Sequence, residues 1–96
     1  MNKIFKLIRQ DITANTLAVF NFDVKGYEYL VKNFNDFPIY VAFETIGNDR
    51  SKTIKIPEQS AQICTMNKSG NLDNTTDTVY VIAEDAGEVE VQCVRY

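Results

Sequence analysis

Histidine and tryptophan are both missing from this sequence of 96 residues. Without histidine, the chain lacks the side chain that most often serves as a general base near neutral pH and as a metal ligand. Cysteine is scarce as well: Cys64 and Cys93 stand far apart, without the short spacing typical of metal ligands. They are expected to be free thiols packed as small apolar groups. These absences predict a protein that is not an enzyme and binds no metal or cofactor.

The sequence also lacks a long apolar run and a cluster of basic residues. No apolar stretch approaches the roughly 20 residues that a membrane-spanning helix requires. Lys6 and Arg9 interrupt the apolar N-terminal residues, so no signal peptide is predicted. Thirteen acidic and ten basic residues give a formal net charge of −3, which disfavours a phosphate-binding surface. We therefore expect a soluble protein made in a cytoplasm, with neither a membrane nor nucleic acid as its partner.

Apolar residues recur at every second position through most of the chain, which is typical of β-strands buried on one face. Phe20 and Phe22, for example, share one face, whereas Asn21 and Asp23 share the other. Polar clusters rich in turn-forming residues separate such segments. We therefore predict one all-β domain over residues 1–96, a single antiparallel β-sandwich or small barrel of about seven or eight short strands.

Two pairs of segments are predicted to form β-hairpins, because a short turn joins the members of each pair. Residues 27–33 and 39–44 flank a turn that contains proline. Residues 79–83 and 89–93 flank a loop that ends in Gly87, and a glycine at that point suits a type I turn followed by a bulge. The second pair is the clearest local signal in the sequence.

Acidic side chains cluster over residues 84–90, and paired carboxylates can perform acid–base chemistry. Glu88 and Glu90, however, alternate with apolar residues and belong to the outward face of a strand, where acidic groups keep a sheet soluble. The oxygen-rich segment 73–77 matches no calcium-binding loop. We interpret the acidic cluster as a solvated face and the segment as a polar loop, so no catalytic or metal-binding residues are predicted.

The N-terminal residues 1–12 are the one ambiguous segment. Ile4, Phe5, Leu7 and Ile8 place apolar groups on more than one face, which is a property of surfaces that contact a partner. The segment is either a helix with one apolar stripe or the first strand of the domain, and a strand is favoured because every later segment is predicted to be β. An extended interface arm and a core strand remain equal alternatives for its role, and these four residues are the candidate interface residues.

Three segments carry a resemblance to a known family. Tyr29–Glu44 reads YLVKNFNDFPIYVAFE, Ile54–Pro57 reads IKIP, and Val79–Gln92 reads VYVIAEDAGEVEVQ. Over roughly residues 17–96, the chain resembles small accessory virion structural proteins of bacteriophages that infect Gram-positive bacteria. This family of head-decoration and head-fibre-like proteins carries similar runs in the same order.

The resemblance implies a minor structural protein of the virion, made in the host bacterial cytoplasm. Such a protein would bind the major capsid protein or neighbouring virion proteins in multiple copies, as a capsid decoration or another minor component. The family motifs consist of strand and turn residues, so they transfer no binding residue to this chain.

A carbohydrate- or receptor-binding module of a phage adsorption apparatus is the alternative function. Tyr27 and Tyr29 are predicted to share a strand face, and amphipathic rings on such a face could stack against a sugar. Tyrosines on strands more often close the rim of a sandwich core, and we favour that interpretation. Sugar-binding sandwiches also commonly expose tryptophan, which this chain lacks.

Overall fold

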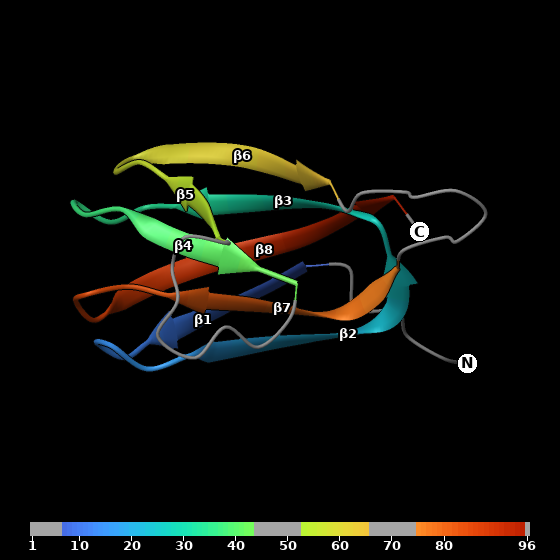
Figure 1. The fold of residues 1–96 in the computed structure, drawn as a ribbon, viewed down its shortest axis with the longest axis horizontal. Coiled ribbons are helices and arrows are strands. Elements are labelled where there is room, and N and C mark those ends of the chain that lie inside the picture. Colours follow the sequence, from blue (N-terminus) through green and yellow to red (C-terminus); the bar gives the residue numbers. More distant parts are fainter. Residues whose placement is uncertain (1–6, 44–52, 66–74, 96) are drawn as a thin grey trace.

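The computed structural model describes residues 7–43, 53–65 and 75–95, which form two antiparallel β-sheets packed face to face (Figure 1). Sheet I has the strand order β1 (Leu7–Ile12), β8 (Gly87–Arg95), β3 (Glu28–Asn33) and β6 (Ser60–Thr65). Sheet II has the order β2 (Ala18–Gly26), β7 (Thr76–Ile82), β4 (Ile39–Ala42) and β5 (Ile54–Ile56). The prediction of an all-β antiparallel sandwich is confirmed, and so is the interpretation of residues 7–12 as the first strand.

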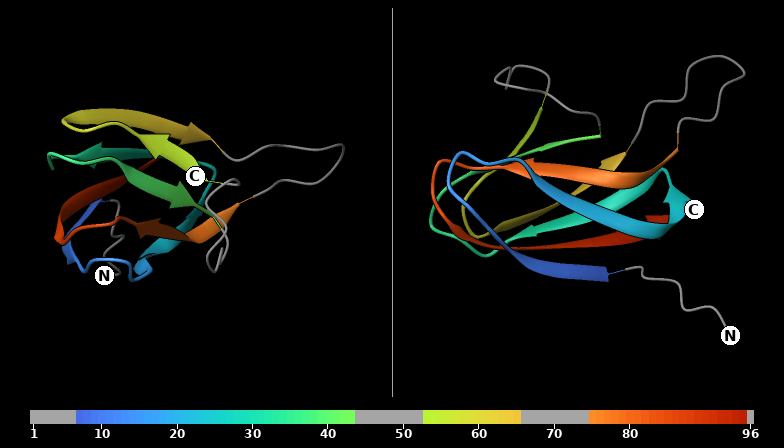
Figure 2. Two further views of the ribbon diagram at one scale, coloured as in Figure 1. Left: turned by 60° about the vertical axis from the view of Figure 1, so that its left-hand side comes forward. Right: turned by 90° about the horizontal axis from the view of Figure 1, so that it is seen from below.

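Successive strands alternate between the two sheets. Among the described strands, six of the seven connections pass from one sheet to the other, and only β4 and β5 follow each other within a sheet. The turns therefore arch from layer to layer at the ends of the sandwich (Figure 2). Both predicted hairpins are wrong in this respect, because β3 and β4 belong to different sheets, as do β7 and β8. Strands on opposite sides of one core show the same alternation as paired strands, so the pattern cannot separate the two arrangements.

The core is a single apolar layer between the sheets. Phe20 and Phe22 of β2 point into it, while the intervening Asn21 is exposed. The ring of Tyr29 on β3 packs against them from sheet I, with its centroid 5.1 Å from that of Phe22 and 5.9 Å from that of Phe43. Valine and isoleucine fill the rest of the layer: Val31, Ile39, Val41, Ile56, Val79, Val81, Val89 and Val91 are fully buried.

The two cysteines lie in this core on separate strands. Tyr29 pairs with Cys64 of β6 on one side and with Cys93 of β8 on the other. About 9–10 Å therefore separates the two cysteines, whereas a disulfide requires Cα atoms within roughly 7 Å. Both cysteines are buried and neither forms a disulfide, and burial raises the pKa of the Cys64 thiol to about 11. The prediction of packed thiols outside a disulfide is confirmed.

A buried hydroxyl group closes one end of the sandwich, where the chain passes from β2 to β3. The Tyr29 hydroxyl donates a hydrogen bond to the carbonyl of Thr76 on β7. It accepts a second one from the N–H of Gly26 at 3.2 Å. A Cβ atom on Gly26 would lie 2.4 Å from Cys93 Sγ and 3.0 Å from the Tyr29 oxygen, so only glycine fits this close approach. One phenol thus ties the two sheets together.

A buried amide closes the opposite end. The Asn33 side-chain nitrogen donates to the backbone carbonyls of Phe37, Ile56 and Pro57 at 2.8, 3.3 and 3.0 Å. Its oxygen accepts hydrogen bonds from the backbone and side chain of Asn35. Asn35 in turn bonds both the N–H and the carbonyl of Glu88. Two asparagines therefore join the turns that follow β3 and β5 to the beginning of β8.

The Tyr29→Phe substitution should remove both hydrogen bonds at the first end while keeping the packing of the ring. The buried Gly26 N–H and Thr76 carbonyl then lack a partner, so the free energy of unfolding should fall by about 1–3 kcal/mol. Urea denaturation measures this loss. Tyr80→Phe, at a half-buried position on the outer side of sheet II, is the control and should change stability by less than about 0.5 kcal/mol. Equal losses in both variants would contradict the role of the hydroxyl.

The Asn33→Asp substitution keeps the side-chain shape but turns a carboxylate oxygen towards three carbonyls. We expect a loss of about 2–4 kcal/mol in the free energy of unfolding, because buried acceptors would face each other without a proton. Asn21→Asp makes the same chemical change at an exposed site whose oxygen already accepts from Thr78. Thermal and urea unfolding should therefore leave the Asn21 variant near the wild-type values. A stable Asn33→Asp protein would refute this account of the amide.

Candidate interaction surface

The outer side of sheet I carries most of the exposed apolar side chains in the described part of the chain. Leu7 of β1 is 48% exposed, Phe34 just after β3 is 48% exposed, and Ile63 of β6 is 52% exposed. Val94 near the end of β8 is also exposed, whereas Val19 is the one such residue on sheet II. Large exposed apolar groups gathered on one face are typical of a protein contact surface.

Strand register places these side chains in rows across the sheet. One row runs from Leu7 through Gln92 and Leu30 to Ile63. Neighbouring strands lie about 4.8 Å apart, so the row is about 14 Å wide. Two further apolar residues, Ala61 and Phe34, continue the face towards the end of β3. We call Leu7, Leu30, Phe34, Ala61 and Ile63 the outer apolar face.

An ion triad crosses the same side of the sheet in the next row. Glu90 on β8 lies between Arg9 of β1 and Lys32 of β3, with N···O distances of 2.9 and 3.0 Å. The two long cationic side chains cover the carboxylate, so Glu90 is only 4% exposed although it points outwards. The hydrogen bond from Arg9, followed by the one from Lys32, is the main reason that the pKa of the Glu90 carboxyl lies below its usual value. The same contact raises the pKa of Arg9.

The sequence-based expectation for Glu90 is therefore wrong in part. The strand alternation correctly predicts its outward direction, but the carboxylate is not solvated. Its partner Arg9 is 81 positions away in the chain, and the strand that carries Arg9 reaches Glu90 only through sheet pairing. Glu88, two residues earlier, is exposed as expected. No local pattern distinguishes these two acids.

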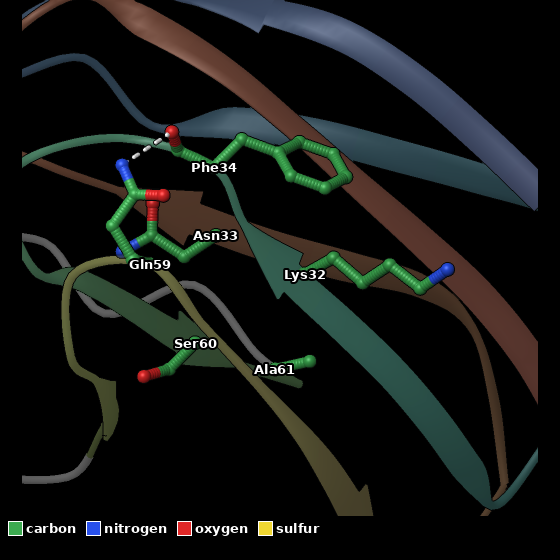
Figure 3. Close-up of a pocket in the computed structure, with 6 residues that line it drawn as sticks. All are labelled: Lys32, Asn33, Phe34, Gln59, Ser60 and Ala61. Carbon is green, nitrogen blue, oxygen red and sulfur yellow. Dashed lines mark hydrogen bonds between the residues drawn. The ribbon is translucent and has the colours of Figure 1, made fainter.

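A shallow cavity of about 190 Å³ adjoins the outer apolar face, where β3 ends and β6 begins (Figure 3). Its lining residues are Lys32, Asn33, Phe34, Gln59, Ser60 and Ala61. The side chains of Lys32 and Phe34 extend to the same side of the strand, and the Gln59 amide donates to the Phe34 carbonyl at 3.1 Å. Pockets for drug-sized ligands commonly hold roughly 300–1,000 Å³. The hollow is closer in size to one side chain of a protein partner.

The candidate interface residues from the sequence have different positions. Leu7 belongs to the outer apolar face, whereas Ile8 points inwards and packs against the core. Ile4 and Phe5 lie outside the described residues. The sequence reasoning missed Leu30 and Ile63, although a signal exists for Leu30: it is a large aliphatic residue between the inward-facing Tyr29 and Val31 of β3.

The tyrosine pair does not present two rings to a ligand. Tyr29 is fully buried in the core, and the backbone N–H of Tyr27 donates to the Arg95 carbonyl at the end of β8. Tyr29 therefore closes the core, as the favoured interpretation predicted. Of the oxygen-rich segment 73–77, only Thr75, Thr76 and Asp77 belong to the described residues.

Residues 7–43, 53–65 and 75–95 contain neither a metal-binding group nor a membrane-spanning helix. No three histidine, cysteine, aspartate or glutamate side chains gather there as a metal-binding group. No helix in those ranges is long and apolar enough to span a membrane. Comparisons of the chain with protein-family models, curated proteins and solved structures give no match.

The ion triad predicts a pH dependence of stability. Because folding lowers the pKa of Glu90, the triad stabilises the protein above the unfolded-state pKa of about 4.3, and this contribution is lost as the pH falls through the lower folded-state value. Glu90→Gln should therefore be less stable than the wild type at pH 7, and the difference should shrink towards pH 3. Urea midpoints across this range measure it. Glu58→Gln, at an exposed acid outside the triad, should show no such trend, and a constant difference for Glu90→Gln would disprove the assignment.

Proposed function

We propose that this chain is a non-enzymatic structural protein of a bacteriophage particle. It would act as a capsid decoration or another minor virion component, and bind the particle in multiple copies. The outer apolar face of sheet I is the observation that carries the binding role. The phage assignment is supported by the resemblance of residues 17–96 to small accessory virion proteins.

The geometry of sheet I suits attachment to another protein. The apolar side chains stand on paired strands, so little conformational entropy is lost when a partner covers them. The ion triad lies on the same surface, where the Glu90 carboxylate is already paired with Arg9 and Lys32. Since two cations surround one anion, a partner meets a preformed apolar strip beside a polar row with a net positive charge. The major capsid protein, or a neighbouring virion protein, is the proposed partner.

The alternative of a carbohydrate- or receptor-binding module has less support. It was suggested by two tyrosine rings on one face, and one of those rings, Tyr29, is buried between the sheets. A buried ring offers no face to a sugar. The outer apolar face is built from aliphatic residues and one phenylalanine, which suits a protein surface better than a polar glycan.

Incorporation into particles tests the proposal. Particles purified from an infected culture should contain the protein at a constant ratio to the major capsid protein, measured by quantitative mass spectrometry. A ratio near one per capsid subunit or capsomer would indicate shell decoration, and about a dozen per particle would indicate a neck, tail or vertex. Absence from intact particles would defeat the virion role.

A matched pair of variants tests the surface itself. Phe34→Asp places a charge in the outer apolar face and should lower the amount of protein in purified particles by about tenfold, because the partner loses a large apolar contact. Val19→Asp introduces the same charge at a similarly exposed position on sheet II and should be incorporated normally. If both variants are incorporated equally, sheet I is not the binding surface.

A further inference from the structure

The free edge of β6 lacks the usual protection of an edge strand. Among the residues that the structure describes, β6 is the last strand of sheet I and pairs only with β3. Its six residues, Ser60–Thr65, include no charged residue and no proline, and its register with β3 runs without a bulge. Four of the six are exposed. Unprotected edges of this kind present a row of N–H and carbonyl groups that can pair with another strand.

The other three edges of the sandwich are each protected. β1 carries Arg9 and Asp11, and its Gln10 side chain donates to the Val19 carbonyl of the neighbouring edge strand β2. β2 itself contains Asp23 and Lys25 and has an irregular register with β7. β5 has only three residues, one of them Lys55, and Pro57 follows it. Charge, short length and irregularity are the common means of blocking edge pairing.

We propose that β6 pairs antiparallel with β6 of a second copy of this chain, across a two-fold axis perpendicular to the sheet. The two four-stranded sheets I then become one continuous sheet of eight strands, four from each copy. Pairing between two identical strands is self-complementary, as a two-fold interface requires. The pairing gives hydrogen-bond partners to the main-chain N–H and carbonyl groups on the open edge of each β6 strand.

Side-chain direction limits the possible registers. Ala61 and Ile63 point outwards and Cys64 points into the core. Opposed residues of an antiparallel pair point to the same side of a sheet. The two-fold axis therefore passes through a residue and not between two residues, because a position between residues would place inward-facing side chains opposite outward-facing ones. Gln62 and Ile63 are the central residues of β6, so an axis at either of them pairs the most residues. With the axis at Ile63, the two isoleucines face each other and extend the row that includes Leu30.

The absence of charged residues on β6 allows a second copy to occupy this edge. Each copy carries a formal net charge of −3, so two copies repel each other at long range. The uncharged β6 edge is where they can meet without placing like charges opposite each other. The same axis directs both outer apolar faces to one side. The pair therefore gains avidity for a surface that binds each face, as two linked sites do.

This pairing adds to the multi-copy role proposed above, because it describes how two copies bind each other. Only the biological purpose of the dimer rests on that proposed role. The contact itself belongs to the purified protein, so it can be tested without particles. Sedimentation velocity over a concentration series should show a reversible dimer. Amide hydrogen exchange at residues 61–65 should slow as the dimer forms, while exchange in β1 should not change. At a protein concentration of about 1 mM, even a dimer with a Kd of about 1 mM would be visible. A protein that stays monomeric at that concentration would overturn the proposal.

Charge complementation identifies the contact residues. Ile63→Lys and Ile63→Glu should each weaken dimerisation at least tenfold, because each places like charges across the axis. An equimolar mixture of the two should recover a heterodimer, because opposite charges then face each other. Leu7→Lys, an equally exposed apolar residue at the opposite edge of sheet I, should dimerise as the wild type does. Circular dichroism confirms that each variant folds.

The outcomes separate this inference from the proposed function. A wild-type dimer that persists in both Ile63 variants would place the contact elsewhere and overturn the pairing of β6. A mixture that fails to recover the dimer would also count against it. Because Ile63 also belongs to the outer apolar face, Phe34→Asp, which lies outside β6, separates the two properties: it should lower incorporation into particles and still dimerise as the wild type does. Normal incorporation of a dimeric Phe34→Asp protein would count against the binding surface and leave the pairing of β6 intact.

Discussion

Backbone hydrogen bonding at the ends of the sandwich is the constraint on which the rest of this structure depends. Six of seven connections leave one sheet and enter the other, and at each crossing the main chain loses its ladder partners. Buried polar groups without partners are costly. Tyr29 supplies those partners at one end and Asn33 at the other, so two side chains hold the layers in one relative position.

The rigidity of that frame allows the outer side of sheet I to remain exposed and apolar. Only the inward-facing side chains of each strand form the core, so core packing does not restrict the outward-facing ones. On sheet I, the outward-facing side chains form an aliphatic row and a covered ion triad rather than scattered solvated charges. An ion triad at a sheet surface adds little to stability in general. Its greater effect here is to pair the Glu90 carboxylate beside an apolar strip, so that this carboxylate does not face a partner unpaired.

Sequence reasoning was sound where a property depends on neighbouring residues. Alternation identified the strands and the inward direction of Val89, Val91 and Cys93, and the lack of histidine limited the chemistry. It failed for strand pairing: the turn before β8 was located correctly, but β8 lies between β1 and β3 instead of beside β7. Turn residues show where the chain reverses. They do not show whether it returns within its own sheet or across the core.

By itself, the sequence determined the all-β class and, for the strands with clear alternation, their positions and the face turned to the core, because the period of two is a local property of extended backbone. It left the inward face of β1 open. Only the tertiary structure decided which strands are neighbours. That decision brings Arg9 to Glu90 across 81 positions, aligns Leu7 with Ile63, and leaves β6 as an open edge. These features depend on pairing between strands that are distant in the sequence, and this pairing is stabilised when two complete sheets bury their apolar faces against each other. No single local segment of the sequence specifies it.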